Sequence, residues 1–424
     1  MEIKLLRKAA IQSLALMIGV VILSYIMEHY NAVAISASKD SDESFDSDLL
    51  TQGEINNISQ GFEPNYSGIQ DHFDASISSY YIFPETDLPI SQSLLEKLGE
   101  QFLIIKKPSG KGLQIKLEDI YLNKSLKLVI SGVMDEEPED IFIGRVNGNE
   151  IFNGEPVCTY IETFDQKEEG IDTEIGARDY GNDPVNLITS TITTDDFGIS
   201  VYDVVLELNH VYVHILYEDD NFYYIDLRRP NEVYDKIIVL DAGHGGKDPG
   251  ALSKDELTYE KEINLAILTK LKELLDKDNI KVYYTKLTDE TLFLRPRVTL
   301  ANEVDCDFFI SIHCNSSVSK KANGTEIFYY DHENKNIKSK DLAEIFIDEI
   351  SKSIPLKNNG IRKMKDKDIF ILYNATVPAV LIEAGYMSDR NDLEYLKSKE
   401  GQDAIAKGIY NGIWRAYEEL MPSE

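Results

Sequence analysis

Two histidines and two glutamates in the C-terminal half of this 424-residue chain could together carry out hydrolytic chemistry. They are His244, Glu260, His313 and Glu383. Hydrolysis of an unactivated amide near neutral pH needs a strong nucleophile and a group that stabilises an oxyanion, and one Zn²⁺ can supply both. Catalytic zinc commonly takes two His and one Glu and leaves one position open, while a further carboxylate handles protons. These residue types therefore predict metal-assisted amide hydrolysis.

The same four residues lie at the ends of elements that the hydrophobic pattern predicts. His244 lies in a Gly-rich turn directly after an apolar strand, His313 and Glu383 each close such a strand, and Glu260 lies in the first turn of a helix. In open α/β sheets, sites form outside the carboxyl ends of the strands. We expect strands at residues 236–240, 280–285, 308–313, 325–330 and 380–383. One helix carries Ile263, Ile267, Leu271 and Leu275, and further helices are expected at 296–304, 340–351 and 405–417. This alternation predicts an α/β catalytic domain with a mostly parallel sheet flanked by helices on both faces.

Other chemistries fail on the residue patterns. The Gly-rich turn could suggest a phosphate loop, but neither GxxxxGK[ST] nor GxGxxG is present, and the HExxH motif of zincins and the GxSxG elbow of serine hydrolases are also missing. Cys314 could suggest a thiol nucleophile, but neighbours on a strand point to opposite faces, so Cys314 should pack if His313 faces the site. His210 and His214 lack a third candidate ligand, and we interpret them as surface or packing residues.

Five segments in matching order and spacing closely resemble the zinc-dependent N-acetylmuramoyl-L-alanine amidases. The first is the strand and turn around Asp241-Ala242-Gly243-His244-Gly245-Gly246, and the last surrounds Ile382-Glu383-Ala384-Gly385. The resemblance covers about residues 236–420, and five segments in register are far more specific than any one of them. The segments are residues 237–251, 260–267, 297–302, 309–315 and 378–386.

The resemblance implies a role for each of the four residues. In the family, the first-motif His, the Glu that opens the next helix and the second His bind zinc, which gives His244, Glu260 and His313 here. The Glu of the last motif is the catalytic base and corresponds to Glu383. Glu262 is a rival ligand, but the family pattern places the ligand directly before Lys, which selects Glu260. Two departures, Cys314 where a small residue is usual and Asp389 where Asn is common, do not touch this set.

The implied reaction is hydrolysis of the peptidoglycan amide between the lactyl group of N-acetylmuramic acid and the L-alanine of the stem peptide. Glu383 would take a proton from the attacking water and return it to the departing amine. Two alternatives remain open: another zinc peptidase that cuts within the stem peptide, and a non-catalytic wall-binding protein. The intact set of ligands and base speaks against the second alternative.

The rest of the chain predicts an extracytoplasmic protein, and the resemblance implies peptidoglycan as its partner. Residues 1–34, with a basic flank and a long apolar run, are predicted to form an uncleaved membrane anchor, a transmembrane helix, and the alternative is a secretion signal that is cleaved. Residues 35–79 are predicted to be an acidic disordered linker, residues 80–230 a β-rich domain of unknown role, and residues 231–424 the catalytic domain.

A net charge of −31 argues against nucleic acid as a partner. Three cysteines form no disulfide framework, and nothing indicates an oligomeric state.

Two finer expectations concern local structure. A helix is expected near residues 91–102, ahead of the β-rich runs. Some members of the resembling family hold a regulatory helix over the zinc, inserted after the strand that follows the second His motif. Here only the short polar stretch at 331–339 separates that strand from the next helix. Because such a stretch has no room for a loop and a plugging helix, the sequence predicts an open cleft.

Overall fold

The computed structural model describes residues 90–133, 143–152, 155–160, 164–165, 184–194, 199–253, 257–319, 321–365 and 367–421. All of them belong to one compact unit, Ser78–Glu424. The predicted anchor at 1–34 and linker at 35–79 lie outside the described residues. Within the described ranges, no helix is long and apolar enough to cross a membrane.

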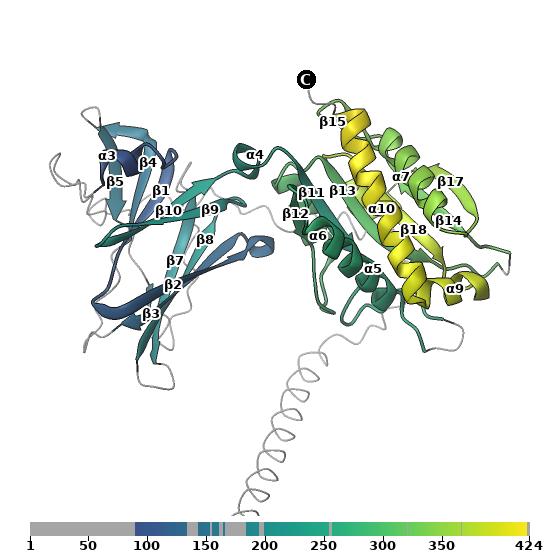
Figure 1. The fold of residues 1–424 in the computed structure, drawn as a ribbon, viewed down its shortest axis with the longest axis horizontal. Coiled ribbons are helices and arrows are strands. Elements are labelled where there is room, and N and C mark those ends of the chain that lie inside the picture. The colour runs from purple at the N-terminus through teal and green to yellow at the C-terminus, as the bar shows by residue number, and fades with distance from the viewer. Residues whose placement is uncertain are drawn as a thin grey trace, which may run out of the picture. The chain divides into compact units, whose positions relative to one another are not determined.

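The N-terminal part of the described chain is a β-sandwich of two five-stranded sheets (Figure 1). Its strands pair antiparallel, except for the parallel pair β6/β7. One sheet has the order β5 (Glu155–Tyr160), β4 (Ile143–Phe152), β1 (Gln101–Lys106), β10 (Phe222–Arg228) and β9 (Val213–Glu218). The other has the order β2 (Gly110–Ile120), β3 (Ser125–Val133), β8 (Ser200–Leu208), β7 (Val185–Thr194) and β6 (Phe164–Asp165).

Alternating apolar residues bring the two sheets together. Leu126, Leu128 and Ile130 of β3 are buried and alternate with less buried neighbours, as expected for a strand with one face in a core. They share a core cluster with Leu103 of β1 and Ile225 of β10 from the other sheet. The β-rich texture predicted from the sequence is therefore confirmed for the described strands.

The prediction of a helix near residues 91–102 is mostly wrong. The helix α3 covers only Gln92–Leu95, and β1 begins at Gln101. The apolar run Phe102–Ile105 pairs with β10 on one side and β4 on the other and is almost completely buried. A short apolar run that is buried on both faces cannot be told from a helix segment by periodicity, and strand pairing decides its conformation.

The C-terminal part is built on a six-stranded mixed sheet. The order is β12 (Lys281–Tyr284), β11 (Ile237–Ala242), β13 (Phe308–Asn315), β18 (Ala379–Tyr386), β14 (Thr325–Tyr329) and β17 (Asn358–Lys363). The first four strands are parallel, as predicted. β14 is antiparallel to β18 and parallel to β17, so the expectation of a mostly parallel sheet holds for four strands and needs correction for the last two.

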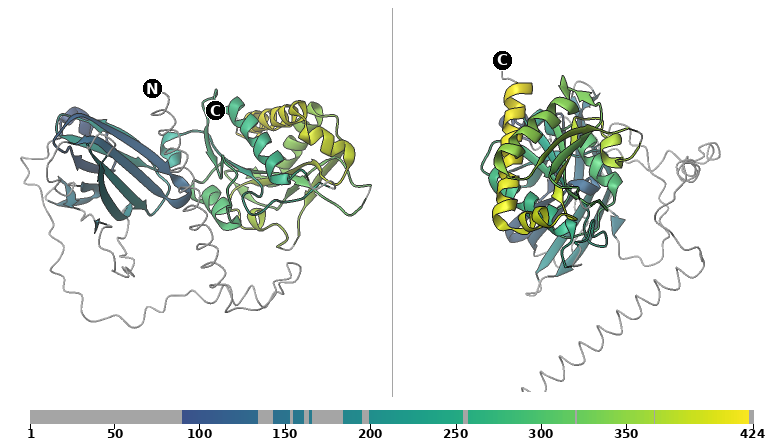
Figure 2. Two further views of the ribbon diagram at one scale, coloured as in Figure 1. Left: turned by 90° about the horizontal axis from the view of Figure 1, so that it is seen from below. Right: turned by 90° about the vertical axis from the view of Figure 1, so that its right-hand side faces the viewer.

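Helices cover both faces of this sheet. On one face lie α5 (Glu260–Leu275), α7 (Ser339–Ser353) and α10 (Lys399–Leu420), whose apolar residues pack on Ile238, Leu240 and Ile310. On the other lie α6 (Leu294–Glu303) and α8 (Phe370–Tyr373), which pack on Val239 and Phe309. The long helix α10 is the yellow ribbon beside α5 and α7 in Figure 1 and is seen from two further directions in Figure 2.

Three short elements complete this part. The stretch after β14 holds the small hairpin β15 (Glu333–Asn334) and β16 (Ile337–Lys338), and α7 follows directly. Helix α9 (Arg390–Lys397) begins where the Asp389 side chain accepts hydrogen bonds from the amides of Asn391 and Asp392. An Asp serves well as this N-cap, so the residue that departs from the family pattern has a local structural role.

Candidate active site and the family of the chain

Three of the four predicted site residues meet at one edge of the mixed sheet. His244 follows β11, His313 lies near the end of β13, and Glu260 is the first residue of α5. Their ligand atoms all lie within 4.8 Å of one another. The sequence thus correctly predicted the elements that carry these residues, and the fold brings them together as candidate metal ligands.

Glycines make this close approach possible. A Cβ atom on Gly243 would lie 2.2 Å from Cε1 of His313, so no other residue fits between the turn and the imidazole. Gly250 has φ +66°, and a Cβ there would lie 2.6 Å from both Glu260 Oε2 and His244 Cδ2. The Gly-rich turn therefore serves to pack the backbone against the ligand side chains.

The two imidazoles are oriented toward the Glu260 carboxylate. His244 Nε2 lies 3.2 Å from Oε2 of Glu260, and His313 Nδ1 lies 3.0 Å from Oε1. On the far side of its ring, His244 Nδ1 lies 2.8 Å from Oδ2 of Asp248. A carboxylate on the outer nitrogen of a histidine fixes the ring orientation and keeps the inner nitrogen free for a metal. Asp248 therefore supports a metal-binding role for His244.

Glu260 is held as a buried carboxylate. It is 4% exposed, and it accepts hydrogen bonds from the amides of Ala251 and Cys314 and from the Asn264 side chain. Burial alone would raise its pKa, but hydrogen bonds and charge from His244 and His313 outweigh burial and hold the pKa well below its ordinary value. A carboxylate that stays ionised between two imidazoles has the donor chemistry that a divalent zinc ion requires.

The rival residue Glu262 lies outside this group. It is exposed, and its carboxylate accepts a long hydrogen bond from the Tyr259 amide at the start of α5. Glu262 therefore belongs to the capping of the helix rather than to the candidate metal centre.

Glu383 lies on the strand next to His313, with the two residues paired in register across β13 and β18. Its Oε2 atom is buried, and no group in the described part of the chain forms a hydrogen bond with it. Burial, followed by the charges of Glu260 and Glu326, raises the pKa of Glu383 well above its ordinary value. Two neighbouring carboxylates whose pKa values are pushed in opposite directions are typical of a ligand or stabiliser beside a general acid or base.

Comparisons with known proteins identify the family of this chain. A sequence model described as N-acetylmuramoyl-L-alanine amidase matches residues 238–415. The chain is 32% identical to the germination-specific N-acetylmuramoyl-L-alanine amidase of Bacillus subtilis over 198 residues, which covers 43% of this chain and 81% of that protein. It is 33% identical to the uncharacterized protein YqiI of the same organism, over 43% of this chain and 86% of that protein. The chain belongs to the N-acetylmuramoyl-L-alanine amidase family.

Among solved structures, the catalytic domain of CwlV, an N-acetylmuramoyl-L-alanine amidase from Bacillus (Paenibacillus) polymyxa var. colistinus, is 34% identical. That match covers 44% of this chain and 99% of the CwlV domain, with a TM-score of 0.40. The family assignment makes this chain a hydrolase with amidase activity on peptidoglycan. The mixed sheet and its helices are referred to below as the amidase domain.

A buried polar network lies below the turn that carries the candidate ligand His244, and the sequence analysis did not predict it. Asp241 is fully buried and accepts hydrogen bonds from Arg297 (2.7 Å), Thr285 (2.6 Å) and Ser311 (2.6 Å). Arg297 also donates to the carbonyl oxygens of Ala242 (2.8 Å) and His244 (3.0 Å). His244 has a φ of +62°, an uncommon conformation for a residue with a side chain.

This network fixes the strained turn that presents His244. Because Arg297 bonds two carbonyl oxygens of the turn while paired with Asp241, it holds the backbone in the conformation that aims the imidazole at Glu260. A sequence signal was available, since Asp241 and Ser311 interrupt strands that are otherwise apolar, and a polar side chain in such a strand must find a buried partner.

The other candidates raised by the sequence have structural roles. Cys314 is buried in the apolar core, and burial raises the pKa of its thiol well above the ordinary value, so the expectation that it packs is confirmed. Neither His210 nor His214 belongs to the metal-ligand group found among the described residues.

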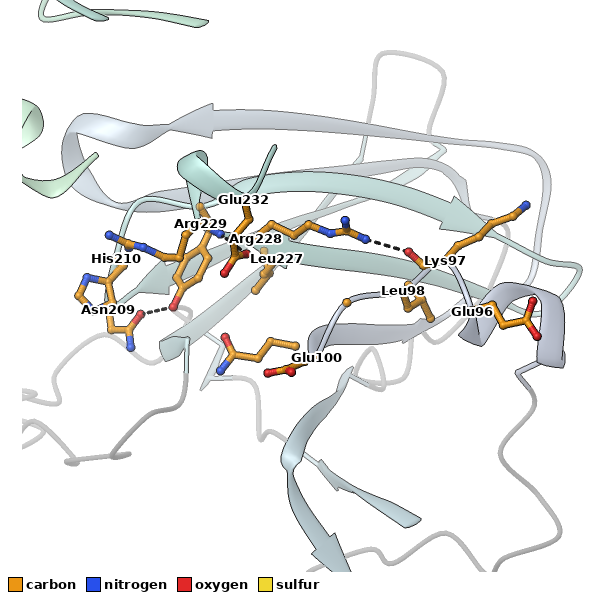
Figure 3. A pocket seen from close by; sticks show the side chains of 13 residues that line it. Glu96, Lys97, Leu98, Glu100, Asn209, His210, Leu227, Arg228, Arg229 and Glu232 are labelled. Carbon is orange, nitrogen blue, oxygen red and sulfur yellow. Dashed lines mark hydrogen bonds between the residues drawn. The ribbon is translucent and has the colours of Figure 1, made fainter. Parts of the chain in front are cut away.

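The β-sandwich carries a pocket of about 720 Å³ (Figure 3). Several of its polar groups already bond one another: Arg228 donates to the Lys97 carbonyl at 2.8 Å, and Tyr212 donates to Asn209 at 2.9 Å. Both acidic and basic side chains line the pocket, so it presents neither a mainly positive nor a mainly negative surface to a ligand. None of the four candidate site residues lines this pocket.

Proposed function

We propose that the amidase domain binds one zinc ion through His244, Glu260 and His313 and hydrolyses the amide between N-acetylmuramic acid and L-alanine. The observation that carries this proposal is the convergence of two imidazoles and one carboxylate within 4.8 Å beside Glu383. When bound, zinc lowers the pKa of a water to about 7 and polarises a carbonyl.

The residues of the chain position the metal ligands and transfer the proton. Asp248 and Glu260 orient the imidazole of His244, and the Arg297–Asp241 pair fixes the backbone that carries it. Glu383, whose Oε2 atom has no partner among the described residues, takes a proton from the attacking water. Its raised pKa suits it to hold that proton and deliver it to the departing amine of L-alanine.

Mass spectrometry of digested peptidoglycan tests this function. Purified sacculi treated with the protein, with and without a chelator, should release stem peptides with a free L-alanine amino group and leave a free lactyl carboxylate on the glycan. New ends within the stem peptide would instead identify a peptidase. The absence of any product from a zinc-loaded protein would identify a wall-binding protein without activity.

We further propose that the domain order predicted from the sequence delivers this activity to the cell wall. Residues 1–34 would anchor the chain in the membrane or be cleaved after secretion, residues 35–79 would act as an acidic spacer, and the part from residue 80 on would work outside the membrane. Limited proteolysis should then cut first within 35–79. N-terminal sequencing of the mature protein distinguishes the two fates, because a start near Ile35 indicates a cleaved signal.

A further inference from the structure

A row of polar side chains extends from the metal ligands across the sheet. His313 pairs with Glu383, and Glu383 pairs on its other side with Glu326 of β14. Residues directly opposite each other on adjacent strands project to the same face. Beyond the base Glu383, the surface of the site therefore continues to Glu326.

Glu326 is a buried carboxylate that organises the end of this row. It is 3% exposed and accepts hydrogen bonds from the Asn315 side chain at 2.9 Å and the Tyr386 hydroxyl at 2.5 Å. Its second oxygen, Oε2, lies 3.1 Å from Nη2 of Arg362 on β17. Three groups from three strands thus meet at one carboxylate beside the base.

Arg362 combines a fixed position with free donor capacity. One of its nitrogens contacts Glu326, and its guanidinium lies over the Phe328 ring at 5.4 Å. Its side chain is nevertheless 63% exposed. A guanidinium carries five N–H donors in a planar fork that matches a carboxylate. Glu326 occupies one edge of the guanidinium and Phe328 covers one face. The remaining N–H donors of Arg362 can therefore bind a ligand on the solvent side.

Solvent screens the Arg362 end of this ion pair, because that side chain is 63% exposed, and the buried Glu326 carboxylate also has the Asn315 and Tyr386 side chains as partners. The electrostatic setting favours a role in binding. The row His313–Glu383–Glu326 leads away from the candidate metal ligands toward Arg362, and the whole chain has a net charge of −31. An anionic substrate group that lies at the Glu326 end of this row would be received there by the Arg362 cation.

We propose that Arg362 is a substrate-binding residue that receives a carboxylate of the peptidoglycan stem peptide when the scissile amide lies at the metal centre. This inference rests on the proposed function. Glu326 and Phe328 hold the guanidinium in place, so that little side-chain entropy is lost when a bidentate contact forms. A lactyl carboxylate, which exists only after cleavage, shares this chemistry and is the alternative source.

The test uses two synthetic muropeptides that are identical except that one stem carboxylate is free in the first and a primary amide in the second. Arg362→Gln should raise KM for the free carboxylate about tenfold or more, the size expected of a charged hydrogen bond. KM for the amide, kcat for both substrates and the zinc content should stay near wild type. Arg362→Lys should restore part of the lost affinity.

The neighbouring Lys363 provides a matched control. It is an exposed cation on the same strand, paired with Asp331, and its side chain points to the other face of β17. Lys363→Gln removes the same charge from the protein and should leave both KM values unchanged. A rise in KM with this variant as well would show a general electrostatic effect and overturn the assignment to Arg362.

The remaining outcomes distinguish a wrong ligand for Arg362, a wrong role for Arg362 and a wrong proposed function. Unchanged KM values together with weaker product inhibition by N-acetylmuramic acid would keep the anion site and assign it to the lactyl carboxylate. An equal rise for both muropeptides, or no change in any of these constants, would overturn the proposal. A wild-type protein that cleaves neither substrate would refute the proposed function itself, which is a different result from an active enzyme indifferent to Arg362.

Discussion

The β-sandwich and the amidase domain bury polar groups differently. Among the described residues of the sandwich, Asp226 is the one fully buried charged side chain, whereas the described amidase domain buries seven: Asp241, Glu260, Lys286, Arg297, Asp307, Glu326 and Asp392. Both parts have apolar cores with nearly inaccessible leucines, isoleucines and aromatic residues. An apolar core is sufficient to form either fold. Buried charges cost free energy unless they are paired, and five of these seven, Asp241, Glu260, Lys286, Arg297 and Glu326, lie in or beside the candidate active site.

The two buried aspartates make the contrast specific. Asp226 accepts hydrogen bonds from the Gly99 amide at 3.0 Å and from Arg228 at 2.7 Å, and so joins two segments of the sandwich. Asp241 has three side-chain partners and lies beneath the turn that carries His244. Asp226 links two backbone segments of the sandwich, whereas Asp241 also supports the turn of a candidate metal ligand. Variants can show whether this distinction holds.

The largest effect is expected from Glu260→Ala. Removing one of three ligands should abolish both zinc binding and hydrolysis, because the two imidazoles would lose the carboxylate between them. Glu262→Ala is the matched control on the same helical turn. It should retain zinc and activity, with only a small loss of stability from the helix cap. Metal analysis of both purified variants decides the point, and loss of zinc in the Glu262 variant would reverse the assignment.

Glu383→Gln should have the next largest effect, with zinc retained. A general base contributes about 10²–10⁴-fold to a rate, and here the same group also protonates the leaving amine. Because Gln has nearly the same shape, binding of the muropeptide should change little and the loss should fall on kcat. Steady-state kinetics with parallel metal analysis measures this. Activity above a tenth of the wild-type value would place the base elsewhere.

Asp241→Asn should destabilise the protein by about 3–5 kcal/mol, the cost of leaving a buried cation without its partner, because Arg297 is 2% exposed. Asp226→Asn should cost less, since its partner Arg228 is 31% exposed and can be hydrated. Denaturant unfolding compares the two. The Asp241 variant should also hold less zinc, whereas the Asp226 variant should bind zinc normally; equal zinc loss in both would erase the contrast.

The contribution of Asp241 to the stability of the protein should depend on pH. Burial would raise the pKa of Asp241, but Arg297, Ser311 and Thr285 outweigh it and hold the pKa below its ordinary value. The stability from this carboxylate is therefore present above the unfolded pKa of about 4 and is lost as the pH falls through the lower, folded value. The stability gap between wild type and Asp241→Asn should narrow in acid. A gap that widens would contradict the ion-pair explanation.

The sequence predicted the site better than it predicted the edges of the fold. His244, His313 and Glu383 were predictable because strand ends in parallel sheets meet at one edge. The strand β17 was missed because Asn358–Lys363 is polar and mostly exposed, without the alternation that identifies a strand. The direction of β14 depends on a long-range pairing with β18, which no local pattern encodes. The sequence analysis did not single out Glu326, because only the pairing of β14 with β18 places this residue next to Glu383.

The smallest effect is expected from removing the sandwich altogether. In the described structure, the stretch after β14 is filled by the hairpin β15–β16, and α7 begins at Ser339. This leaves no helix in that stretch that could cover the metal centre, which agrees with the short connection seen in the sequence. Residues 231–424 should therefore cleave a small soluble muropeptide with the same kcat/KM as the protein from residue 80 onward.

A soluble substrate is essential for this comparison, because a sandwich that binds the wall would raise the local concentration of enzyme on sacculi without changing the site. Equal rates on the muropeptide and a slower rate of the isolated domain on sacculi would assign the sandwich to wall binding. Zinc content and thermal unfolding of the isolated domain must be measured alongside, so that a poorly folded fragment is not mistaken for a regulated one. A folded, zinc-loaded domain that stays silent until a partner protein is added would show that control of the site lies outside residues 231–424.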